Sequence, residues 1–202
     1  MADLFRTIES PSEGLYKEKG SKFIAFAYSI DSEEAIKEKI VSIRKQYHDA
    51  RHHCFAWRLG ADMERYRVND DGEPSGSAGK PILGQIQSQN LTDILVVVIR
   101  YFGGTLLGVG GLMNAYRSAT ADALNNANIL ELKVFVRMNL NFSYPQMNGV
   151  MKVIKDFHLE FENQEFDLEC SLTLKVWQRD QDRVIERMSK IEGCKIVLEA
   201  GV

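Results

Sequence analysis

Apolar residues recur at helical spacing in two parts of the first two thirds of the chain. The first series ends near Tyr47 and follows Asp31 and Glu34, a pair typical of a helix start in which the glutamate reaches back to a free backbone N–H group. The second series begins at Leu112. The two series are Ile36, Ile40, Ile43 and Tyr47, and Leu112, Ala115, Tyr116, Ala119 and Ala123. This spacing predicts two amphipathic helices, with a shorter helix over residues 82–89 between them.

Other segments have the composition and alternation of β-strands. We expect strands at residues 21–30, 52–59, 64–68 and 93–101, with the second and third joined as a hairpin. Residues 93–101 are almost all apolar, which is typical of a strand buried on both faces in the centre of a sheet. In residues 52–59, alternation places His53, Phe55, Trp57 and Leu59 on one face and His52, Cys54, Ala56 and Arg58 on the other.

The pattern changes after Asn128 and indicates a second domain. Residues 136–143 alternate apolar and polar as in a half-buried strand, Pro145 suits a first helical turn, and Asp180 is suited to cap a later helix. With strands predicted at 158–165, 167–177 and 195–199, the order is β-α-β-β-α-β, the ferredoxin-like signature. The sequence therefore predicts an α+β protein with domains at residues 1–130 and 136–202.

Composition and charge narrow the classes of function. The chain has 202 residues, of which 45% are hydrophobic and 26% charged, as in an ordinary globular protein. No apolar run approaches the roughly 20 residues of a membrane-spanning helix, and no secretory signal is recognised, so we expect a cytoplasmic protein without a membrane partner. The net charge of −3 means that nucleic-acid binding requires a local basic patch. Three cysteines without paired spacing suggest neither a disulfide framework nor a zinc knuckle.

A glycine-rich segment at residues 102–111 follows the apolar strand and precedes a predicted helix. Glycines let backbone N–H groups approach a phosphate, the start of a helix attracts anions, and Arg100 and Arg117 would add positive charge. The segment fits no Walker pattern. Two interpretations stay open: an anion site, or a tight strand-to-helix turn that needs glycine for packing.

Residues 69–81 contain three glycines, two prolines and short polar side chains, and therefore predict a long loop. Its side chains Asp70, Asp71, Glu73, Ser75, Ser77 and Lys80 are a set that would hold a hard cation or a polar substrate. The spacing does not match a calcium-binding loop, so a solvated turn is the alternative. His52 and Cys54 lie on the same face of one predicted strand and would form a nucleophile dyad only with a third orienting group, which the sequence does not supply.

The two segments together are similar to a known family. The sequence at residues 70–81, 100–104 and 107–112, with residues 49–54 upstream, closely resembles the YigZ/IMPACT family. The resemblance implies an N-terminal domain like the second domain of a small-subunit ribosomal protein, and a C-terminal domain like the ferredoxin-like fifth domain of elongation factor G. Eukaryotic relatives regulate the pathway that restrains translation initiation under amino-acid shortage, so the resemblance points toward translation.

We therefore expect the two segments to meet and form a polar cleft that binds RNA, the ribosome or a nucleotide phosphate. A small enzyme acting on a phosphorylated or nucleotide substrate and a protein-interaction regulator are the alternatives, and the sequence assigns no catalytic residue and no cofactor. A translation-related protein is a further expected partner. The candidate binding residues are Arg51, His53, Asp70, Asp71, Glu73, Ser75, Ser77, Lys80, Arg100, Gly103, Gly104, Gly108, Gly110, Gly111 and Arg117.

Overall fold

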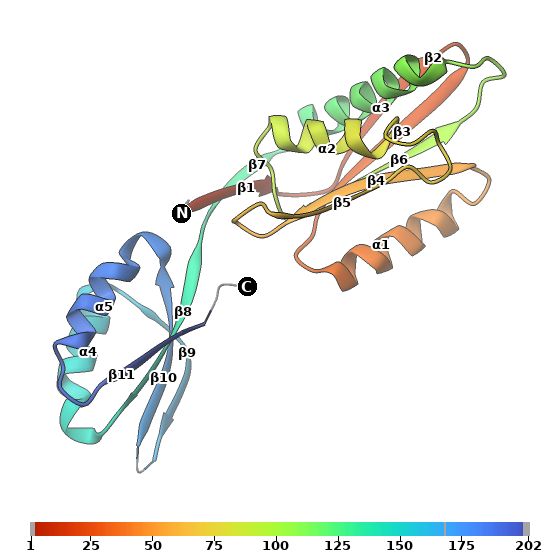
Figure 1. Ribbon diagram of the computed structural model, residues 1–202. Helices are drawn as coiled ribbons and strands as arrows, with labels where there is room; N and C mark the ends of the chain where they lie inside the picture. Colours follow the sequence, from red (N-terminus) through yellow and green to blue (C-terminus); the bar gives the residue numbers. More distant parts are fainter. Residues whose placement is uncertain (1–2, 168, 200–202) are drawn as a thin grey trace. The chain divides into compact units, whose positions relative to one another are not determined.

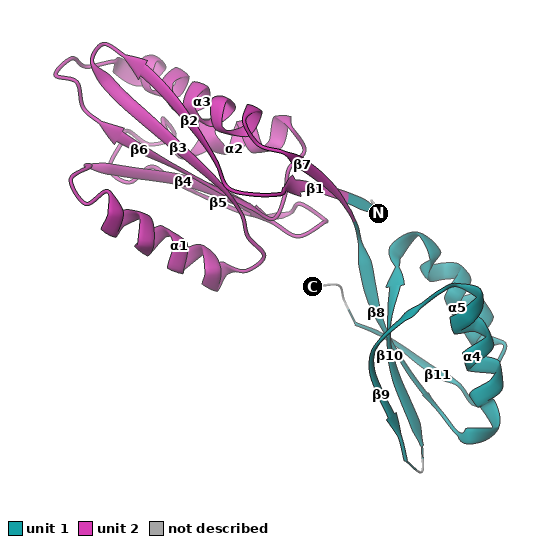
Figure 2. Ribbon diagram, turned by 180° about the vertical axis from the view of Figure 1, so that it is seen from behind, with its two compact units in different colours: residues 1–4, 133–202 teal, residues 5–132 magenta. Residues whose placement is uncertain are grey.

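The computed structural model describes residues 3–167 and 169–199, which divide into two units (Figure 2). The first unit is Phe5–Leu132, and the second contains the chain from Lys133 onward together with Asp3 and Leu4. The sequence assigned Asp3 and Leu4 to the first domain. They group with the second unit because the Asp3 carbonyl accepts hydrogen bonds from the Val134 N–H group at 2.9 Å and from Trp177 Nε1 at 3.1 Å.

A five-stranded antiparallel sheet is the centre of the first unit (Figure 1). Its order is β2-β3-β6-β4-β5, and every neighbouring pair is antiparallel. The strands are β2 (Ser12–Glu18), β3 (Ser21–Ser29), β6 (Ile94–Tyr101), β4 (His52–Leu59) and β5 (Arg65–Asn69). The apolar strand β6 lies in the middle, as its composition predicts.

Helices cover both faces of this sheet. Helix α1 (Glu33–Gln46) lies on one face, and α2 (Gly79–Ser88) and α3 (Gly108–Asn125) lie on the other (Figure 1). Phe55, Trp57 and Leu59 of β4 belong to the core beneath α1, whereas Cys54 and Ala56 belong to the core beneath α2 and α3. The predicted division of β4 into two faces is therefore confirmed, and both faces are buried.

Three helix starts differ from the sequence-based prediction. The N-cap of α1 is Ser32, whose Oγ accepts the Ala35 N–H group at 3.3 Å, so the prediction of Asp31 as the start was wrong. Helix α2 begins at Gly79, inside the predicted loop, because the Asp70 carboxylate accepts the N–H groups of Ala78 and Gly79. Helix α3 begins at Gly108, among glycines assigned to a loop. Packing of Leu107 and Leu112 in the core outweighs the weak helix propensity of those glycines.

Three strands were missed in the sequence. These are β2 and the two partners of a separate two-stranded sheet, β1 (Leu4–Ile8) and β7 (Ile129–Lys133). The buried positions of β2 begin with Ser12 and Gly14, which give no apolar alternation. Glycine is required at position 14 because a Cβ atom there would lie 2.2 Å from the Ala123 nitrogen of α3.

The second unit has the ferredoxin-like order that the sequence predicts. Its elements are β8 (Phe135–Phe142), α4 (Met147–Asp156), β9 (Glu160–Phe166), β10 (Cys170–Trp177), α5 (Gln181–Ser189) and β11 (Lys195–Glu199), with short 3₁₀ helices at Tyr144–Gln146 and Gln178–Asp180. The sheet order is β11-β8-β10-β9, and each neighbouring pair is antiparallel. Helices α4 and α5 pack on one face, where Met138, Leu172 and Val184 are among the buried residues. Among the described residues, no helix is both long and apolar enough to cross a membrane.

Candidate functional site

Both glycine-bearing segments lie at one edge of the first sheet. Strand β4 starts where β6 ends, because His52 pairs with Arg100 in the register. Residues 70–78 lead directly into α2, and residues 102–107 lead directly from β6 into α3, so both helices begin at this edge. We call this region the loop edge. It comprises residues 49–51, 70–78 and 102–107 with the first turns of α2 and α3.

A buried ion pair joins the two segments. Arg100 Nη1 donates to Glu73 Oε1 at 2.7 Å and to Oε2 at 3.0 Å, and the two side chains are only 7% and 4% exposed. The Arg100 guanidinium also lies over the rings of Phe23 and Phe102. Because removing one member would leave the other charge buried without its partner, this pair holds the two loops together.

Tyr116 and Cys54 extend this buried network. The Tyr116 hydroxyl donates to Glu73 Oε1 at 2.7 Å, and the Cys54 Sγ lies 3.3 Å from the same hydroxyl and 3.0 Å from the Asp70 carbonyl. Burial raises the pKa of Tyr116 and the pKa of Cys54 well above their ordinary values. Cys54 is therefore a neutral core thiol rather than a nucleophile. The sequence predicts Tyr116 only as part of an apolar helical stripe, because helical spacing carries no information about a hydroxyl partner.

The Asp70 carboxylate organises the loop that precedes α2. It accepts backbone N–H groups from Gly76, Ala78 and Gly79 at 2.8–3.0 Å. Burial alone would raise the pKa of Asp70, but these three hydrogen bonds and the charge of Lys80 outweigh burial and lower that pKa. Asp70 thus supplies the capping carboxylate that α2 lacks in its own N-cap residue, Ala78.

Asp71 ties the loop to α1 and β4. Its Oδ1 accepts from Arg44 Nη2 at 2.6 Å and its Oδ2 accepts the His53 N–H group at 2.7 Å. The ring nitrogens of His52 and His53 contact the backbone carbonyls of Asp71 and Tyr47. All three loop carboxylates therefore have partners within the protein, and His53 is buried. Among the described residues, no group of three or more His, Cys, Asp and Glu side chains is arranged to hold a metal ion.

Two buried polar atoms at the loop edge have no hydrogen-bond partner, Ser77 Oγ and Arg100 Nε. Ser77 itself is fully buried, whereas its neighbour Ser75 is exposed. Unpartnered polar atoms are uncommon in protein interiors and are often found where a water molecule or a ligand completes the network.

The exposed part of the loop edge includes backbone and two cations, together with the Asp49 carboxylate and the apolar side chains of Phe102, Leu106 and Val109. Arg51 and Lys80 are exposed, as are Gly104, Gly108 and Gly110. A Cβ atom at any of these three glycines would meet no group within 4 Å, so packing does not require their small size. Packing does restrict the other two candidate glycines, Gly103 and Gly111. A Cβ at Gly103 would lie 1.9 Å from the Gly20 carbonyl carbon, and one at Gly111 would lie 3.0 Å from the Leu107 Cβ. Arg117 is exposed farther along α3, beyond its first turn.

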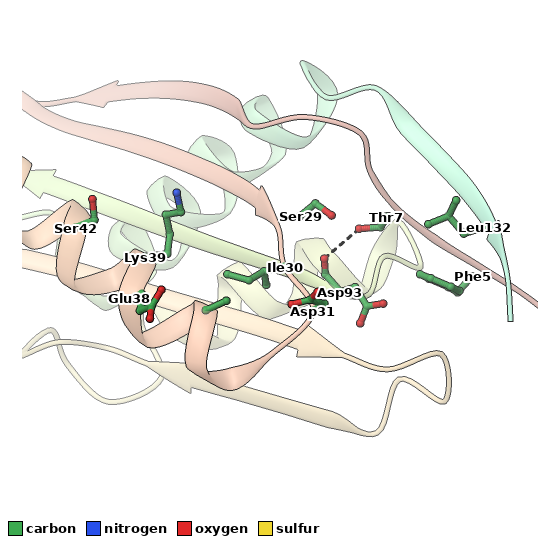
Figure 3. Close-up of a pocket in the computed structure, with 11 residues that line it drawn as sticks. Phe5, Thr7, Ser29, Ile30, Asp31, Glu38, Lys39, Ser42, Asp93 and Leu132 are labelled. Atoms are coloured by element: carbon green, nitrogen blue, oxygen red, sulfur yellow. Dashed lines mark hydrogen bonds between the residues drawn. The ribbon is translucent and has the colours of Figure 1, made fainter. Parts of the chain in front are cut away.

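A cavity of about 610 Å³ lies at the opposite edge of the same sheet, where β3 ends and β6 begins (Figure 3). Asp31, Glu38 and Asp93 line it beside apolar groups that include Ile30 and Phe5, and Lys39 is also present. Burial and the nearby Asp31 charge raise the pKa of Asp93. The hydrogen bond that Asp93 accepts from the Gly60 N–H group lowers this pKa but does not outweigh burial. This acidic lining is less suited to a phosphate than the loop edge is.

Comparison with known proteins places the first unit in one family. A model of the Impact N-terminal domain matches residues 19–124. IMPACT family member YigZ of Escherichia coli (strain K12) is 40% identical over 134 residues, which are 65% of this chain and 66% of that protein. IMPACT family member YvyE of Bacillus subtilis (strain 168) is 28% identical over 201 residues, 100% of this chain and 93% of that protein.

Similarity to a solved structure covers both units. The solved structure titled "Crystal structure of an hypothetical protein" matches this chain with a TM-score of 0.75 and 30% sequence identity. The match covers 99% of this chain and 98% of that chain. The family match covers the loop edge, and the structural match covers the two-unit α+β architecture. The chain belongs to the IMPACT family.

Proposed function

We propose that this IMPACT-family protein is a translation-linked regulator that binds the phosphate backbone of RNA at the loop edge. The observation that carries the proposal is the open first turn of α3. Gly110 lies in that turn and is required neither by packing nor by its backbone conformation, whereas the positive φ of Gly108, +71°, itself favours glycine. Free N–H groups at the start of an 18-residue helix attract a phosphate, and glycine lets the phosphate approach closely.

Neighbouring charges support the same ligand. Lys80 is exposed in the first turn of α2, and Arg51 is exposed just before β4, so two cations lie at the edge where both helices begin. The contacts of this edge favour binding over metal-assisted catalysis, because Asp70, Asp71 and Glu73 are engaged by backbone N–H groups or arginines. The link to translation is what the resemblance to the family implies, and the family match covers residues 19–124.

The test measures RNA binding by the whole protein, with the fluorescence anisotropy of a labelled single-stranded RNA as the readout. Gly110→Ala is the sharpest variant, because a methyl group there contacts no neighbouring residue of the fold but occupies the space above the helix start. Arg51→Ala and Lys80→Ala remove the exposed charges. Lys37→Ala, on the exposed side of α1, is the matched control for loss of one positive charge.

We expect Gly110→Ala to melt at or above the temperature of the unmodified protein and to bind RNA several-fold more weakly. Arg51→Ala and Lys80→Ala should weaken binding more than Lys37→Ala does. Equal affinities for all four variants and the unmodified protein would remove the loop edge as the binding site. Full displacement of RNA by an equimolar nucleoside triphosphate would instead identify a nucleotide site.

A further inference from the structure

The face of the second sheet opposite α4 and α5 carries aromatic and basic side chains. Apolar residues of β8 and β10 face the two helices, including Met138, Leu140 and Leu172. The alternate residues of the same strands are on the other side of the sheet, which we call the open face. Figures 1 and 2 show that α4 and α5 both lie on one side of this sheet. On β8 and β10 the open face comprises Phe135, Arg137, Asn139, Asn141, Ser171, Thr173, Lys175 and Trp177.

Two aromatic residues occupy directly opposed positions on the two central strands of this sheet. Trp177 of β10 pairs with Phe135 of β8 in the register, at one end of the open face. Both residues are partly exposed. Directly opposed residues in an antiparallel sheet lie on the same face with their Cβ atoms about 4.5–5.5 Å apart, so both aromatic side chains are available to one ligand on this face.

Three cations lie over these two rings. Lys175 Nζ is 4.4 Å from the centre of the Phe135 ring. The Arg179 Cζ atom is 4.1 Å from the centre of the Trp177 ring, and Lys133 Nζ is 4.5 Å from it. The ion pairs of the described part of this unit join other groups, among them Arg137 with Glu162. In the described part of this unit the three cations form no ion pair with a carboxylate, and they lie over aromatic rings instead, although Glu160 of β9 is directly opposite Lys175 in the register. Strand β9 carries Glu160, Glu162 and Glu165, which disfavour phosphate at that side of the sheet.

We propose that Phe135 and Trp177 stack bases of single-stranded RNA, while Lys133, Lys175 and Arg179 bind the adjacent phosphates. A base stacked on an aromatic ring contributes more than an exposed cation–π contact, so a base can displace a cation from the ring. The displaced cation then meets the phosphate that arrives with the base. Four-stranded sheets with aromatic residues on their central strands bind single-stranded RNA in this way in other proteins.

This inference takes its ligand from the proposed function but uses a different unit and different residues. The loop edge contacts phosphate through backbone and charge, whereas the open face contacts bases. The loop-edge variants therefore separate the two proposals. Gly110→Ala should weaken binding and leave the signal from Trp177 intact.

Trp177 supplies a direct measurement on the full chain. The protein has two tryptophans, and Trp57 is only 6% exposed, so quenching by a bound base should come from Trp177. The probe is an oligouridine of about eight nucleotides. We expect saturable quenching of tryptophan fluorescence, with little quenching by the same length of double-stranded RNA.

Variants test the residues. Trp177→Ala should bind oligouridine about tenfold more weakly, and Trp177→Phe should retain most of the affinity because it keeps a ring. Lys175→Ala should weaken binding more than Lys152→Ala, a control on the exposed side of α4. Arg179→Ala serves as a second variant should Trp177→Ala fail to fold as judged by circular dichroism.

Three results would overturn the inference. These are RNA binding without a change in tryptophan fluorescence, equal quenching by single and double strands, and equal affinity of Lys175→Ala, Arg179→Ala and Lys152→Ala. Unchanged RNA affinity of the loop-edge variants, with quenching of Trp177 retained, would overturn the proposed loop-edge site and leave the open face supported.

Discussion

At the scale of single residues, the Glu73–Arg100 pair determines how the loop edge can be tested. Arg100 was a candidate charge donor for a ligand, yet its Nη1 atom is held by Glu73 in the interior. A change at Arg100 would alter stability as well as any binding. The exposed residues Arg51 and Lys80 are therefore the better probes of RNA affinity.

The pair itself yields a prediction about stability. Arg100→Met should lower the free energy of unfolding by about 3–5 kcal/mol, because it leaves the Glu73 carboxylate buried beside only the Tyr116 hydroxyl. The double variant Arg100→Met with Glu73→Leu should cost less than the sum of the two single changes. Urea unfolding of the three variants measures this coupling, and additive costs would contradict it.

Asp70 yields a prediction about pH. The pKa of Asp70 is lowered in the fold, so its carboxylate stabilises the native state above the unfolded-chain value of about 3.9, and this contribution is lost as pH falls through the folded value. Asp70→Asn should lower the free energy of unfolding at pH 7 by about 2 kcal/mol.

The difference between Asp70→Asn and the unmodified protein should shrink as the pH approaches 3. Denaturant unfolding at a series of pH values measures it, with Glu64→Gln at an exposed position as a comparison. A constant difference across the series would show that ionised Asp70 contributes nothing.

At the scale of elements, close backbone approach explains which glycines the fold requires. Gly14→Ala should destabilise the first unit by about 1–3 kcal/mol, because its Cβ would lie 2.6 Å from the Ala119 carbonyl oxygen of α3. Gly84→Ala, in the middle of α2 and without a neighbour within 4 Å, should stabilise it by about 1 kcal/mol. Thermal unfolding of both variants measures the two effects. Equal shifts of the transition temperature would contradict the prediction.

The same elements show which parts of the fold can be predicted from the sequence. The continuous apolar run of β6 and the helical spacing of apolar residues in α1 and α3 are clear in the sequence, and these elements were predicted. Strand β2 was not, because its buried positions Ser12 and Gly14 are small rather than apolar. The start of α2 depends on Asp70, whose capping partners lie six to nine residues along the chain.

The position of the candidate site in the fold was predictable from the sequence, but the contacts of its side chains were not. Glycine content and family resemblance located the two segments, and the structure brings them to one edge of the sheet. Which side chains turn inward was not predictable, because the partners of Glu73 and Asp71 lie 18 to 43 residues away in sequence. Phe102, which lies over Arg100, gave no signal of its own in the sequence.

At the scale of the whole molecule, the net charge of −3 makes RNA binding depend on a few local cations. The logarithm of affinity for single-stranded RNA should fall linearly with the logarithm of salt concentration, with a slope of about −0.7 for each phosphate contacted. The double variant Arg51→Ala with Lys80→Ala should reduce the magnitude of that slope by about 1.4. Titrations at several salt concentrations measure it, and an unchanged slope would mean that neither cation meets a phosphate.

The hydrogen bonds of Asp3 make the second unit discontinuous in sequence. A fragment that starts at Lys133 would lack the carbonyl that accepts Val134 N–H and Trp177 Nε1. The first unit is thus inserted between two neighbouring segments of the second. Joining Leu4 to Lys133 through a short turn should give a minimal protein that keeps these bonds, and in it the stacking of bases by Trp177 can be measured without the loop edge.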